Sequence, residues 1–232
     1  MIDSPRLTGA DRDFWRRWVA SRRLDVPRLE RLEQRAVAEV RAFSRERRYV
    51  SVSWGKDSVV TAAIARRADP AIPLVWCTTG SQTNPDCPGV RDAYLSDWPS
   101  PYEEVAVDPG DLADDGGRRA ARREARRDAN DMYGCRITGV RAEESTTRRM
   151  SAAVHGVATE ETCRPILRWT TVDVFAYLIW RDLPIHPAYA MTHGGLLDPT
   201  WLRVGTVGGD RGGERRRSWE RAYYGDVLAS LA

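Results

Sequence analysis

The sequence predicts an α/β protein: a parallel five-stranded sheet flanked by helices on both faces, with two further helices in front of it. Two observations lead to this class. Short apolar segments that suit buried strands alternate with longer segments of helical periodicity, an order that implies right-handed connections and parallel strands. The chain also has 232 residues, of which 42% are hydrophobic, enough for one α/β domain with its own core.

The N-terminal helices are expected at 9–23 and 27–47, where apolar residues such as Leu29, Leu32 and Ala36 recur at helical spacing. Pro27 suits the first turn of the second helix, where its missing N–H costs little. Strands are expected at 49–53, 73–77, 102–107, 135–140 and 163–167, and further helices at 57–67, 88–97, 118–131, 142–150 and 170–181. We divide the chain into N-terminal helices (1–47), an α/β domain (48–190) and a Gly/Arg-rich loop with a C-terminal helix (191–232).

Composition narrows the setting of the protein. No stretch approaches the roughly 18 apolar residues that span a bilayer, and the N-terminus lacks the apolar region of a signal peptide. The four cysteines, Cys77, Cys87, Cys135 and Cys163, include no Cys-x-x-Cys pair, so we expect no disulfide framework and a cytoplasmic protein without membrane contact. The net charge is only +3, so any polyanion binding must come from local patches.

One loop concentrates the candidate chemistry. Ser53-Trp54-Gly55-Lys56-Asp57-Ser58 joins an apolar strand to a helix, which gathers backbone N–H groups and a helix N-terminus at one point and favours an anion such as phosphate. Lys56 is the only lysine among 36 basic residues, and its compact charge suits a phosphate cradle better than a planar guanidinium. Alternatively, it is a lysine that survived a bias toward arginine. Asp57 fits a helix N-cap, a Mg²⁺ ligand or an orienting group for a loop amide.

This loop is not the Gly-x-x-x-x-Gly-Lys-Ser/Thr loop of kinases and GTPases, because only one glycine is present and Asp57 follows the lysine. It resembles the PP-loop, Ser-Gly-Gly-x-Asp-Ser, of the ATP pyrophosphatase superfamily, with Trp54 in place of the first glycine. Two later segments are similar to the phosphoadenosine phosphosulfate reductase-like branch of that superfamily. They are Gly139-Val140-Arg141-Ala142-Glu143-Glu144-Ser145 with Arg148, and Pro165-Ile166-Leu167-Arg168-Trp169 with Asp173-Val174 and Tyr177-Leu178. Trp169, Val174 and Tyr177 also read as ordinary core residues of a helix.

The resemblance implies an adenine nucleotide alpha hydrolase-like fold with ATP over the carboxyl ends of the strands and Mg²⁺ beside its phosphates. It implies catalytic roles for Lys56, Asp57 and Ser58, and Asp57 is the possible Mg²⁺ ligand. The implied nucleotide-binding residues are Ser53, Trp54, Gly55, Lys56, Asp57, Ser58, Thr79, Gly80, Gly139, Arg141, Glu144, Ser145 and Arg148. The implied reaction is cleavage of ATP between its α and β phosphates, which adenylates an acceptor so that sulfur can replace its oxygen.

The sequence also departs from this branch. It has no cysteine after Cys163, whereas the reductases resemble one another in a nucleophilic cysteine near the C-terminus. It has Thr78-Thr79-Gly80 where many relatives have Asp-Thr-Gly, and no cysteine set for an iron–sulfur cluster, so none is expected. The chain most resembles the ATP pyrophosphatase component of bacterial DNA phosphorothioation systems, in which a cysteine desulfurase supplies the sulfur.

Alternatives remain at this stage. One is a phosphoadenosine phosphosulfate reductase-like or sulfate adenylyltransferase-like enzyme of sulfonucleotides. Another is a non-catalytic nucleotide- or nucleic-acid-binding module. The acceptor can be DNA, tRNA or a small molecule, the sulfur donor can be a desulfurase or another protein, and an oligomer is possible.

Two arginine patches suggest polyanion binding. Arg118, Arg122 and Arg126, with the neighbouring arginines 119, 123 and 127, repeat at helical spacing, and their mutual repulsion weakens the helix unless an anion neutralises it. Arg215, Arg216 and Arg217 form the second patch. These arginines predict a track for DNA, touched directly or through a partner, for tRNA, or for an acidic protein. The alternative is a solvated face in an arginine-biased protein.

Overall fold

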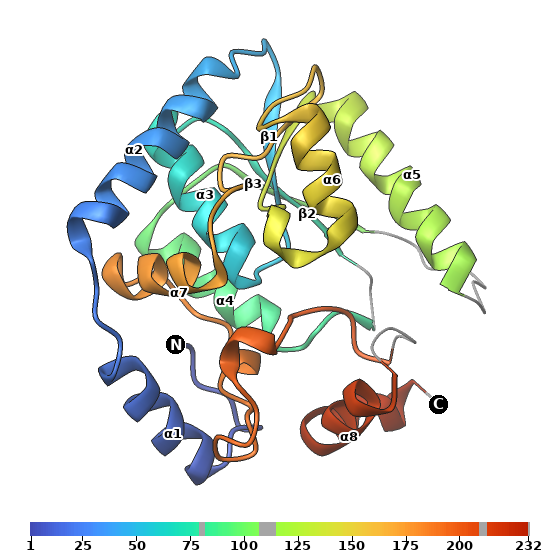
Figure 1. The fold of residues 1–232 in the computed structure, drawn as a ribbon. Coiled ribbons are helices and arrows are strands. Elements are labelled where there is room, and N and C mark those ends of the chain that lie inside the picture. The colour runs from blue at the N-terminus through green and yellow to red at the C-terminus, as the bar shows by residue number, and fades with distance from the viewer. Residues whose placement is uncertain (79–81, 107–114, 209–212, 232) are drawn as a thin grey trace.

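The computed structural model describes residues 1–78, 82–106, 115–208 and 213–231, with only the backbone described at 115–119 and 122. It contains a parallel five-stranded sheet of strand order β3-β2-β1-β4-β5 (Figure 1). The strands are β1 (Arg48–Val52), β2 (Leu74–Thr78), β3 (Tyr102–Ala106), β4 (Cys135–Thr138) and β5 (Thr162–Cys163). The predicted fold class is therefore confirmed.

Side chains that alternate along the strands face two different layers of helices. Val50, Leu74 and Ile137 face the main core, which includes Val59, Val60 and Ile64 of α3 (Lys56–Ala68). Helices α2 (Val26–Ala42) and α7 (Thr171–Trp180) pack on α3 in the same layer. Tyr49 and Val75 face the other way, toward Ala129 of α5 (Asp115–Tyr133). The chain is thus a sheet between two layers of helices.

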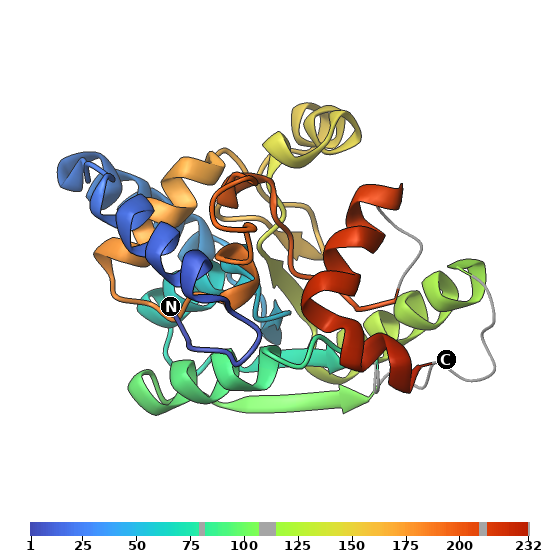
Figure 2. The ribbon, with the colours of Figure 1, turned by 90° about the horizontal axis from the view of Figure 1, so that it is seen from below.

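The remaining helices are α1 (Gly9–Ala20), α4 (Cys87–Asp97), α6 (Thr146–His155) and α8 (Gly213–Ser230). Seen from below, α1 (dark blue) and α8 (red) lie on either side of the orange-red segment that leads into α8 (Figure 2). One continuous core runs from Leu7 to Tyr224, so the N-terminal and C-terminal segments pack on the α/β domain. In the parts of the chain that the structure describes, no helix is long and apolar enough to cross a bilayer.

A buried carboxylate fixes the C-terminal segment to α1. Asp11 is fully buried and accepts hydrogen bonds from the backbone N–H groups of Thr192 (3.1 Å) and Gly194 (2.9 Å) and from the Tyr223 hydroxyl (3.1 Å). Burial alone would raise the pKa of Asp11, but these hydrogen bonds and those from Thr8 hold the pKa below its ordinary value. The N-terminal helix therefore positions the chain segment that forms one wall of the site described below.

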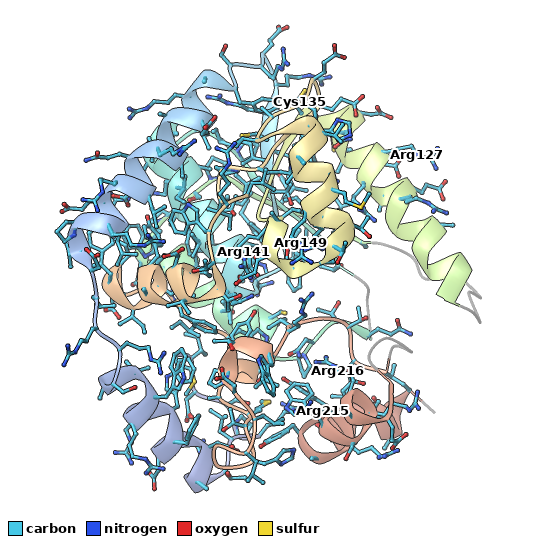
Figure 3. All side chains as sticks on the ribbon, in the orientation of Figure 1. Arg127, Cys135, Arg141, Arg149, Arg215 and Arg216 are labelled. Carbon is cyan, nitrogen blue, oxygen red and sulfur yellow. The ribbon has the colours of Figure 1, made fainter. Side chains whose placement is uncertain are left out.

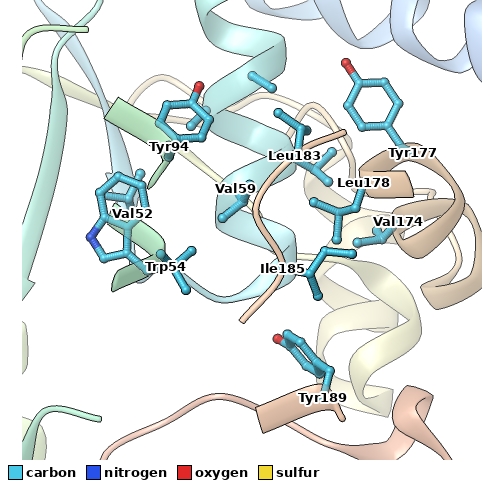
Figure 4. Packing of buried hydrophobic residues seen from close by; sticks show 14 of the residues in the cluster. Val52, Trp54, Val59, Tyr94, Val174, Tyr177, Leu178, Leu183, Ile185 and Tyr189 are labelled. Atoms are coloured by element: carbon cyan, nitrogen blue, oxygen red, sulfur yellow. The ribbon is translucent and has the colours of Figure 1, made fainter. Parts of the chain in front are cut away.

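The core contains the residues expected there from the third sequence segment. Trp169, Val174 and Tyr177 are at most 3% exposed, and Figure 4 shows Val174, Tyr177 and Leu178 packed beside Val59 of α3. Trp54, Tyr94 and Val52 form the neighbouring part of the same core. The interpretation of these helix positions as core residues is confirmed.

Several predicted boundaries were wrong. The last strand was expected at 163–167, but β5 ends at Cys163 and residues 165–168 form a turn, closed by the Leu167 N–H donating to the Arg164 carbonyl at 3.0 Å. Pro165, Ile166 and Leu167 of this turn are buried by tertiary packing, so their apolar character did not indicate a strand. The helix expected at 142–150 is a 3₁₀ turn at Ala142–Glu144 followed by α6, because Ser145 caps the new helix by accepting from the Arg148 N–H.

Candidate functional site

A cavity of about 840 Å³ opens at the carboxyl ends of β1 and β4. These strands are neighbours in the sheet, but the chain leaves β1 toward β2 and returns to β4 on the other side. Such a switch point is where open parallel sheets bind ligands, because both strand ends and a helix N-terminus converge there. The residues that line the cavity include Ser53, Gly55, Lys56, Asp57, Ser58, Gly139, Glu144, Arg148, Tyr189, Trp201, Arg203, Arg215, Arg216 and Glu220.

The loop at 53–58 forms one wall of this cavity. Gly55 is the residue before the first turn of α3, and the backbone N–H of Lys56 donates to the buried Tyr189 hydroxyl at 3.1 Å. The Ser58 hydroxyl donates to the Gly55 carbonyl at 2.9 Å and accepts from the Ser53 N–H at 3.1 Å. The loop is thus closed on itself at the N-terminus of a 13-residue helix, an arrangement that attracts anions.

Trp54 sets the direction of the loop. Its φ of 58° lies in the left-handed region, which is uncommon for a bulky residue, and its side chain is fully buried. The indole packs against Trp76, Tyr94 and Tyr102 with ring centroids 5.7–6.4 Å apart. The strained backbone is therefore held by aromatic packing behind the loop, and the Trp54 side chain points away from the cavity.

Lys56 lines the cavity although its side chain is only 5% exposed. Its Nζ lies 2.6 Å from Asp57 Oδ2 and 5.5 Å from the centre of the Tyr189 ring. Burial lowers the pKa of Lys56, while the Asp57 carboxylate beside it opposes that change. The geometry places a compact, partly desolvated cation at the helix N-terminus, where it can meet a phosphate.

Arg141 holds Asp57 from the other side. Its guanidinium is 2% exposed and donates to Asp57 Oδ1 (2.6 Å), Glu143 Oε2 (2.7 Å), the Trp169 carbonyl (3.2 Å) and Thr171 Oγ1 (3.0 Å). Asp57 thus bridges Lys56 and Arg141. It lies in the first turn of α3, one residue after Lys56, so it is not the N-cap that one of our interpretations proposed. The structure shows Asp57 as the group that orients the Lys56 side chain.

Gly139 allows β4 to approach this cluster. A Cβ atom at this position would lie 2.6 Å from the Asp57 carbonyl oxygen, closer than real Cβ contacts, and 3.0 Å from Thr61 Oγ1, which is tighter than most of them. Only glycine therefore fits where the end of β4 meets the first turn of α3. This contact brings the 53–58 loop and the 139–148 segment, which are far apart in the sequence, to the same cavity.

Glu144 organises the far side of the cavity. One carboxylate oxygen accepts from the Arg141 backbone N–H at 3.0 Å and pairs with Arg148, and the other lies 3.9 Å from Arg203. Arg203 also donates to the Glu144 backbone carbonyl at 3.2 Å. Burial lowers the pKa of Arg148, and the nearby Arg203 lowers it further. Two guanidinium groups therefore share one carboxylate beside the cavity.

The sequence prediction missed the wall formed by residues 189–220. Tyr189, Trp201 and Arg203 line the cavity together with Arg216 of α8, which donates to Glu220 Oε1 (2.7 Å) and to the Arg203 carbonyl (2.9 Å). Figure 3 shows Arg215 and Arg216 on the α8 side and Arg141 and Arg149 on the side of the strand ends. The sequence prediction named Arg215 and Arg216 only as part of a polyanion patch and did not place them, or Trp201, at this cavity.

The predicted site residues fall into three groups. Ser53, Gly55, Lys56, Asp57, Ser58, Gly139, Glu144 and Arg148 lie together around the cavity. Thr79 and Gly80 lie outside the described residues. The side chains of Trp54, Arg141 and Ser145 are not part of the lining: Trp54 and Arg141 are buried behind the loop, and Ser145 caps α6. In this structure these three side chains contact neighbouring protein groups, and their contact with a nucleotide stays a prediction.

The arginine patches differ from each other. Arg126 lies on the described part of α5, whereas the side chains of Arg118 and Arg122 lie outside the description. A smaller, open hollow of about 240 Å³ lies between α5 and β4, lined by Arg123, Arg126, Arg127, Asn130 and Arg136. In the second patch, Arg216 pairs with Glu220 and Arg217 with Glu214, so part of its charge is already neutralised.

The cysteines lie outside the cavity lining, although the buried Cys87 thiol lies 3.7 Å from the Ser53 carbonyl of the 53–58 loop. No cysteine occurs among the described lining residues. Burial raises the pKa of the Cys87 and Cys163 thiols to about 12 and raises that of Cys77, which keeps them as thiols at neutral pH. Cys135 begins β4, at the opposite end of the sheet from Arg215 (Figure 3).

The donor set suits a Mg²⁺ ion that arrives with phosphates. In the described ranges, no group of three His, Cys, Asp or Glu side chains is arranged to hold a metal. Asp57 offers one carboxylate at the cavity, but its two oxygens pair with Lys56 and Arg141. Mg²⁺ commonly binds through one or two carboxylates plus substrate phosphates. The residues therefore fit a nucleotide-borne ion better than a resident one, and Asp57 remains its predicted contact.

Comparison with known proteins supports the fold and the family resemblance. Residues 117–207 match the model of the phosphoadenosine phosphosulfate reductase domain, a range that covers the end of β4 but not the 53–58 loop. The structure is similar to a phosphoadenylyl-sulfate reductase from Candida auris in a phosphate complex, with a TM-score of 0.58 and 15% identity over 82% of this chain and 98% of that chain. A comparison with curated proteins gave no match.

Two synthetases share the fold as well. The NMN synthetase of Francisella tularensis gives a TM-score of 0.50 with 11% identity over 67% of this chain and 71% of that chain. The NH₃-dependent NAD synthetase of Campylobacter jejuni gives 0.51 with 12% identity over 88% of each chain. The chain thus shares the fold class of these three enzymes, a parallel sheet between layers of helices. Within that class, the particular similarity of residues 117–207 is to the phosphoadenosine phosphosulfate reductase domain.

Proposed function

We propose that this protein is an ATP pyrophosphatase that cleaves ATP between its α and β phosphates and adenylates an acceptor for sulfur incorporation. The observation that carries the proposal is the closed loop at 53–58, in which Lys56 lies at the N-terminus of α3 and faces the switch-point cavity. The loop N–H groups, the helix dipole and Lys56 all stabilise negative charge at one point. Pyrophosphate is the leaving group whose developing charge would form there.

The remaining residues would act as follows. Asp57 and Arg141 hold the Lys56 ammonium in place, and the Ser53 and Ser58 hydroxyls contribute to the loop that receives the β and γ phosphates. Arg148 and Arg203 also line the cavity and would contact the α phosphate or an acceptor oxygen. A Mg²⁺ ion that arrives with ATP would neutralise part of the phosphate charge. Thr79 and Gly80 remain the predicted nucleoside contacts.

The acceptor in this proposal is a DNA phosphate, as in bacterial DNA phosphorothioation, with the sulfur delivered by a cysteine desulfurase or another sulfur-donor protein. Two observations favour this version. The cavity lining has no cysteine within the described chain, so the sulfur would come from outside. The hollow between α5 and β4 gathers four arginines, and the buried Nε of Arg136 has no hydrogen-bond partner in the part of the chain that is described, which suits a phosphate backbone.

A second candidate is an enzyme of sulfonucleotides, which the match of residues 117–207 to the phosphoadenosine phosphosulfate reductase domain favours. Incubation with ATP labelled on the α and γ phosphates, alone and with DNA, separates the two. The proposal expects labelled pyrophosphate, with the α label in free AMP where water is the acceptor and attached to the DNA where a DNA phosphate is adenylated. Release of ADP and orthophosphate would contradict it, and tight binding of phosphoadenosine phosphosulfate without pyrophosphate release would support the second candidate.

A further inference from the structure

Trp201 is an unusual residue at the mouth of the cavity. Its side chain is 68% exposed, whereas Trp54, Trp169 and Trp219 are each at most 4% exposed. It ends the short 3₁₀ turn Pro199–Trp201 and lines the same cavity as the 53–58 loop. Because this exposed indole lies at the mouth of a ligand cavity, its flat apolar face is available for a ligand to stack on.

The turn that carries Trp201 is held in place. The Asp198 carboxylate accepts from the Thr200 N–H at 2.7 Å and from the Thr200 hydroxyl at 2.6 Å. The next residue, Leu202, is buried, and the Arg203 carbonyl accepts from Arg216 of α8 at 2.9 Å. The indole is therefore presented by an anchored turn, which reduces the entropy lost when a ligand stacks on it.

Arg215 lies beside this indole. Its guanidinium carbon is 5.5 Å from the centre of the Trp201 ring, within the range of a cation–π contact. Among the described residues, no carboxylate lies within ion-pair distance of Arg215, whereas its neighbours Arg216 and Arg217 pair with Glu220 and Glu214. Arg215 thus combines a planar surface with a positive charge that remains available to an anion.

The charge around the cavity also favours an anionic ligand. Five basic and three acidic side chains line it, and each acid is already paired: Asp57 with Lys56, Glu144 with Arg148, and Glu220 with Arg216. A ligand that offers a flat aromatic face next to a negative charge matches this mouth. A nucleotide unit of a nucleic acid has both, and its base exposes a π-face only when it is unpaired and unstacked.

We propose that Trp201 and Arg215 form a platform on which one unpaired base of a single-stranded DNA segment stacks, with its phosphate directed toward the arginines of the cavity. This inference rests on the proposed function in one respect: the stacked strand is the acceptor, and the platform would set its phosphate beside the site where ATP is cleaved. It names the acceptor as single-stranded or locally opened DNA and not an intact duplex.

The test is binding of a fluorescein-labelled twelve-residue oligothymidylate, measured by anisotropy without ATP. Trp201→Ala is expected to weaken binding about 5- to 150-fold, the range for the loss of one base-stacking contact. Trp201→Phe should retain most of the affinity, because the ring face remains. Arg215→Ala should also weaken binding and flatten the dependence of log K on log salt by about 0.7, the value for one phosphate contact on a single strand.

Two control variants are matched to these changes. Trp180 also carries a stacked arginine, with Arg181 3.6 Å from its ring centre, but it lies on α7 outside the cavity lining. Arg221 lies on α8, is exposed and pairs with Glu214. Trp180→Ala and Arg221→Ala should therefore change oligonucleotide affinity by less than about twofold.

ATP affinity is measured in parallel for the same variants. The proposal expects Trp201→Ala to weaken oligonucleotide binding by about fivefold or more and to change ATP binding by less than about twofold. A larger loss of ATP affinity than of oligonucleotide affinity would show that Trp201 stacks the adenine of ATP, and it would overturn the proposal. The proposal would also be overturned if Trp201→Ala left the affinity for the oligonucleotide unchanged, or if it weakened binding of a hairpin duplex by the same factor. Failure to release pyrophosphate from ATP would contradict the proposed function but not the platform, so the two failures are distinguishable.

Discussion

Replacement of Arg141 by methionine tests whether the buried guanidinium holds the loop at 53–58 together. The variant keeps a long apolar stem but removes the donors to Asp57, Glu143, Thr171 and the Trp169 carbonyl. Breaking one member of a buried ion pair costs about 3–5 kcal/mol. Because the Glu143 and Asp57 side chains are 49% and 20% exposed, water partly replaces the lost donors, and we expect a loss near the lower end, about 3 kcal/mol.

The free energy of unfolding is measured by urea titration with far-ultraviolet circular dichroism. Arg141→Lys should recover only part of the loss, because one ammonium cannot reach both carboxylates with the geometry of the planar fork. Asp57→Asn is the partner in a double-mutant cycle, and we expect the two changes to be non-additive by about 1 kcal/mol or more because the side chains are in contact.

ATP cleavage is measured on the same variants, since Arg141 acts on the reaction through Asp57 and Lys56. Arg141→Met should lower the rate of pyrophosphate release more than the affinity for ATP, because the misplaced ammonium matters most for the charge that develops on the leaving group. A loss of stability below about 1 kcal/mol, or strictly additive effects of the Arg141 and Asp57 changes, would refute this account of the buried cluster.

Three further predictions follow from the same region. Lys56→Ala should lower the rate of pyrophosphate release by about 100-fold, which corresponds to about 2.7 kcal/mol. Lys56→Arg should also lower this rate, because the buried space suits a compact ammonium. Full activity of the arginine variant under saturating ATP would count against the role given to this lysine. Gly139→Ala should destabilise the fold by about 1–3 kcal/mol in thermal or urea unfolding, because the new Cβ meets the Asp57 carbonyl oxygen, and a neutral effect would mean that β4 can move away from α3 at no cost. Burial lowers the pKa of His186 from 6.5 to about 3, so below pH 6.5 the unfolded chain binds a proton that the folded chain does not. The free energy of unfolding should therefore fall by about 1.4 kcal/mol per pH unit as the pH drops below 6.5. His186→Asn keeps an acceptor for the Ala188 N–H, and its stability should decline less steeply than that of the native chain between pH 6.5 and 5.

The order of strands and helices was predictable because it depends on local periodicity. Apolar segments such as 49–53 alternate with helical segments, and parallel pairing follows from the long connections between them. The loop at 53–58 was also visible, since glycine, serine and lysine follow directly after a strand. What periodicity did not reveal was that the apolar residues 165–167 form a buried turn, because burial there comes from packing of distant segments.

The distribution of roles within the site depends on contacts between distant residues. Arg141 and Asp57 are 84 positions apart, and only the fold shows that the arginine lies behind the aspartate and not in the cavity. The wall built by Tyr189, Trp201 and Arg203 was missed for the same reason. These residues reach the cavity because Asp11 and Tyr223 fix the chain near residue 192, and no local pattern encodes that connection.

The packing of Trp54 limits which substitutions related sequences can accept at this position. Its backbone holds an unfavourable conformation only because Trp76, Tyr94 and Tyr102 enclose the ring. A smaller side chain at any of these three positions would loosen the loop, and a glycine at position 54 would relax the backbone and leave space among the three rings. Related chains should therefore exchange these four residues as a set, so that an aromatic cage accompanies tryptophan and a different packing accompanies glycine. Selection on the loop at 53–58 would then also act on Trp76, Tyr94 and Tyr102, which lie on β2, α4 and β3 and outside the cavity lining.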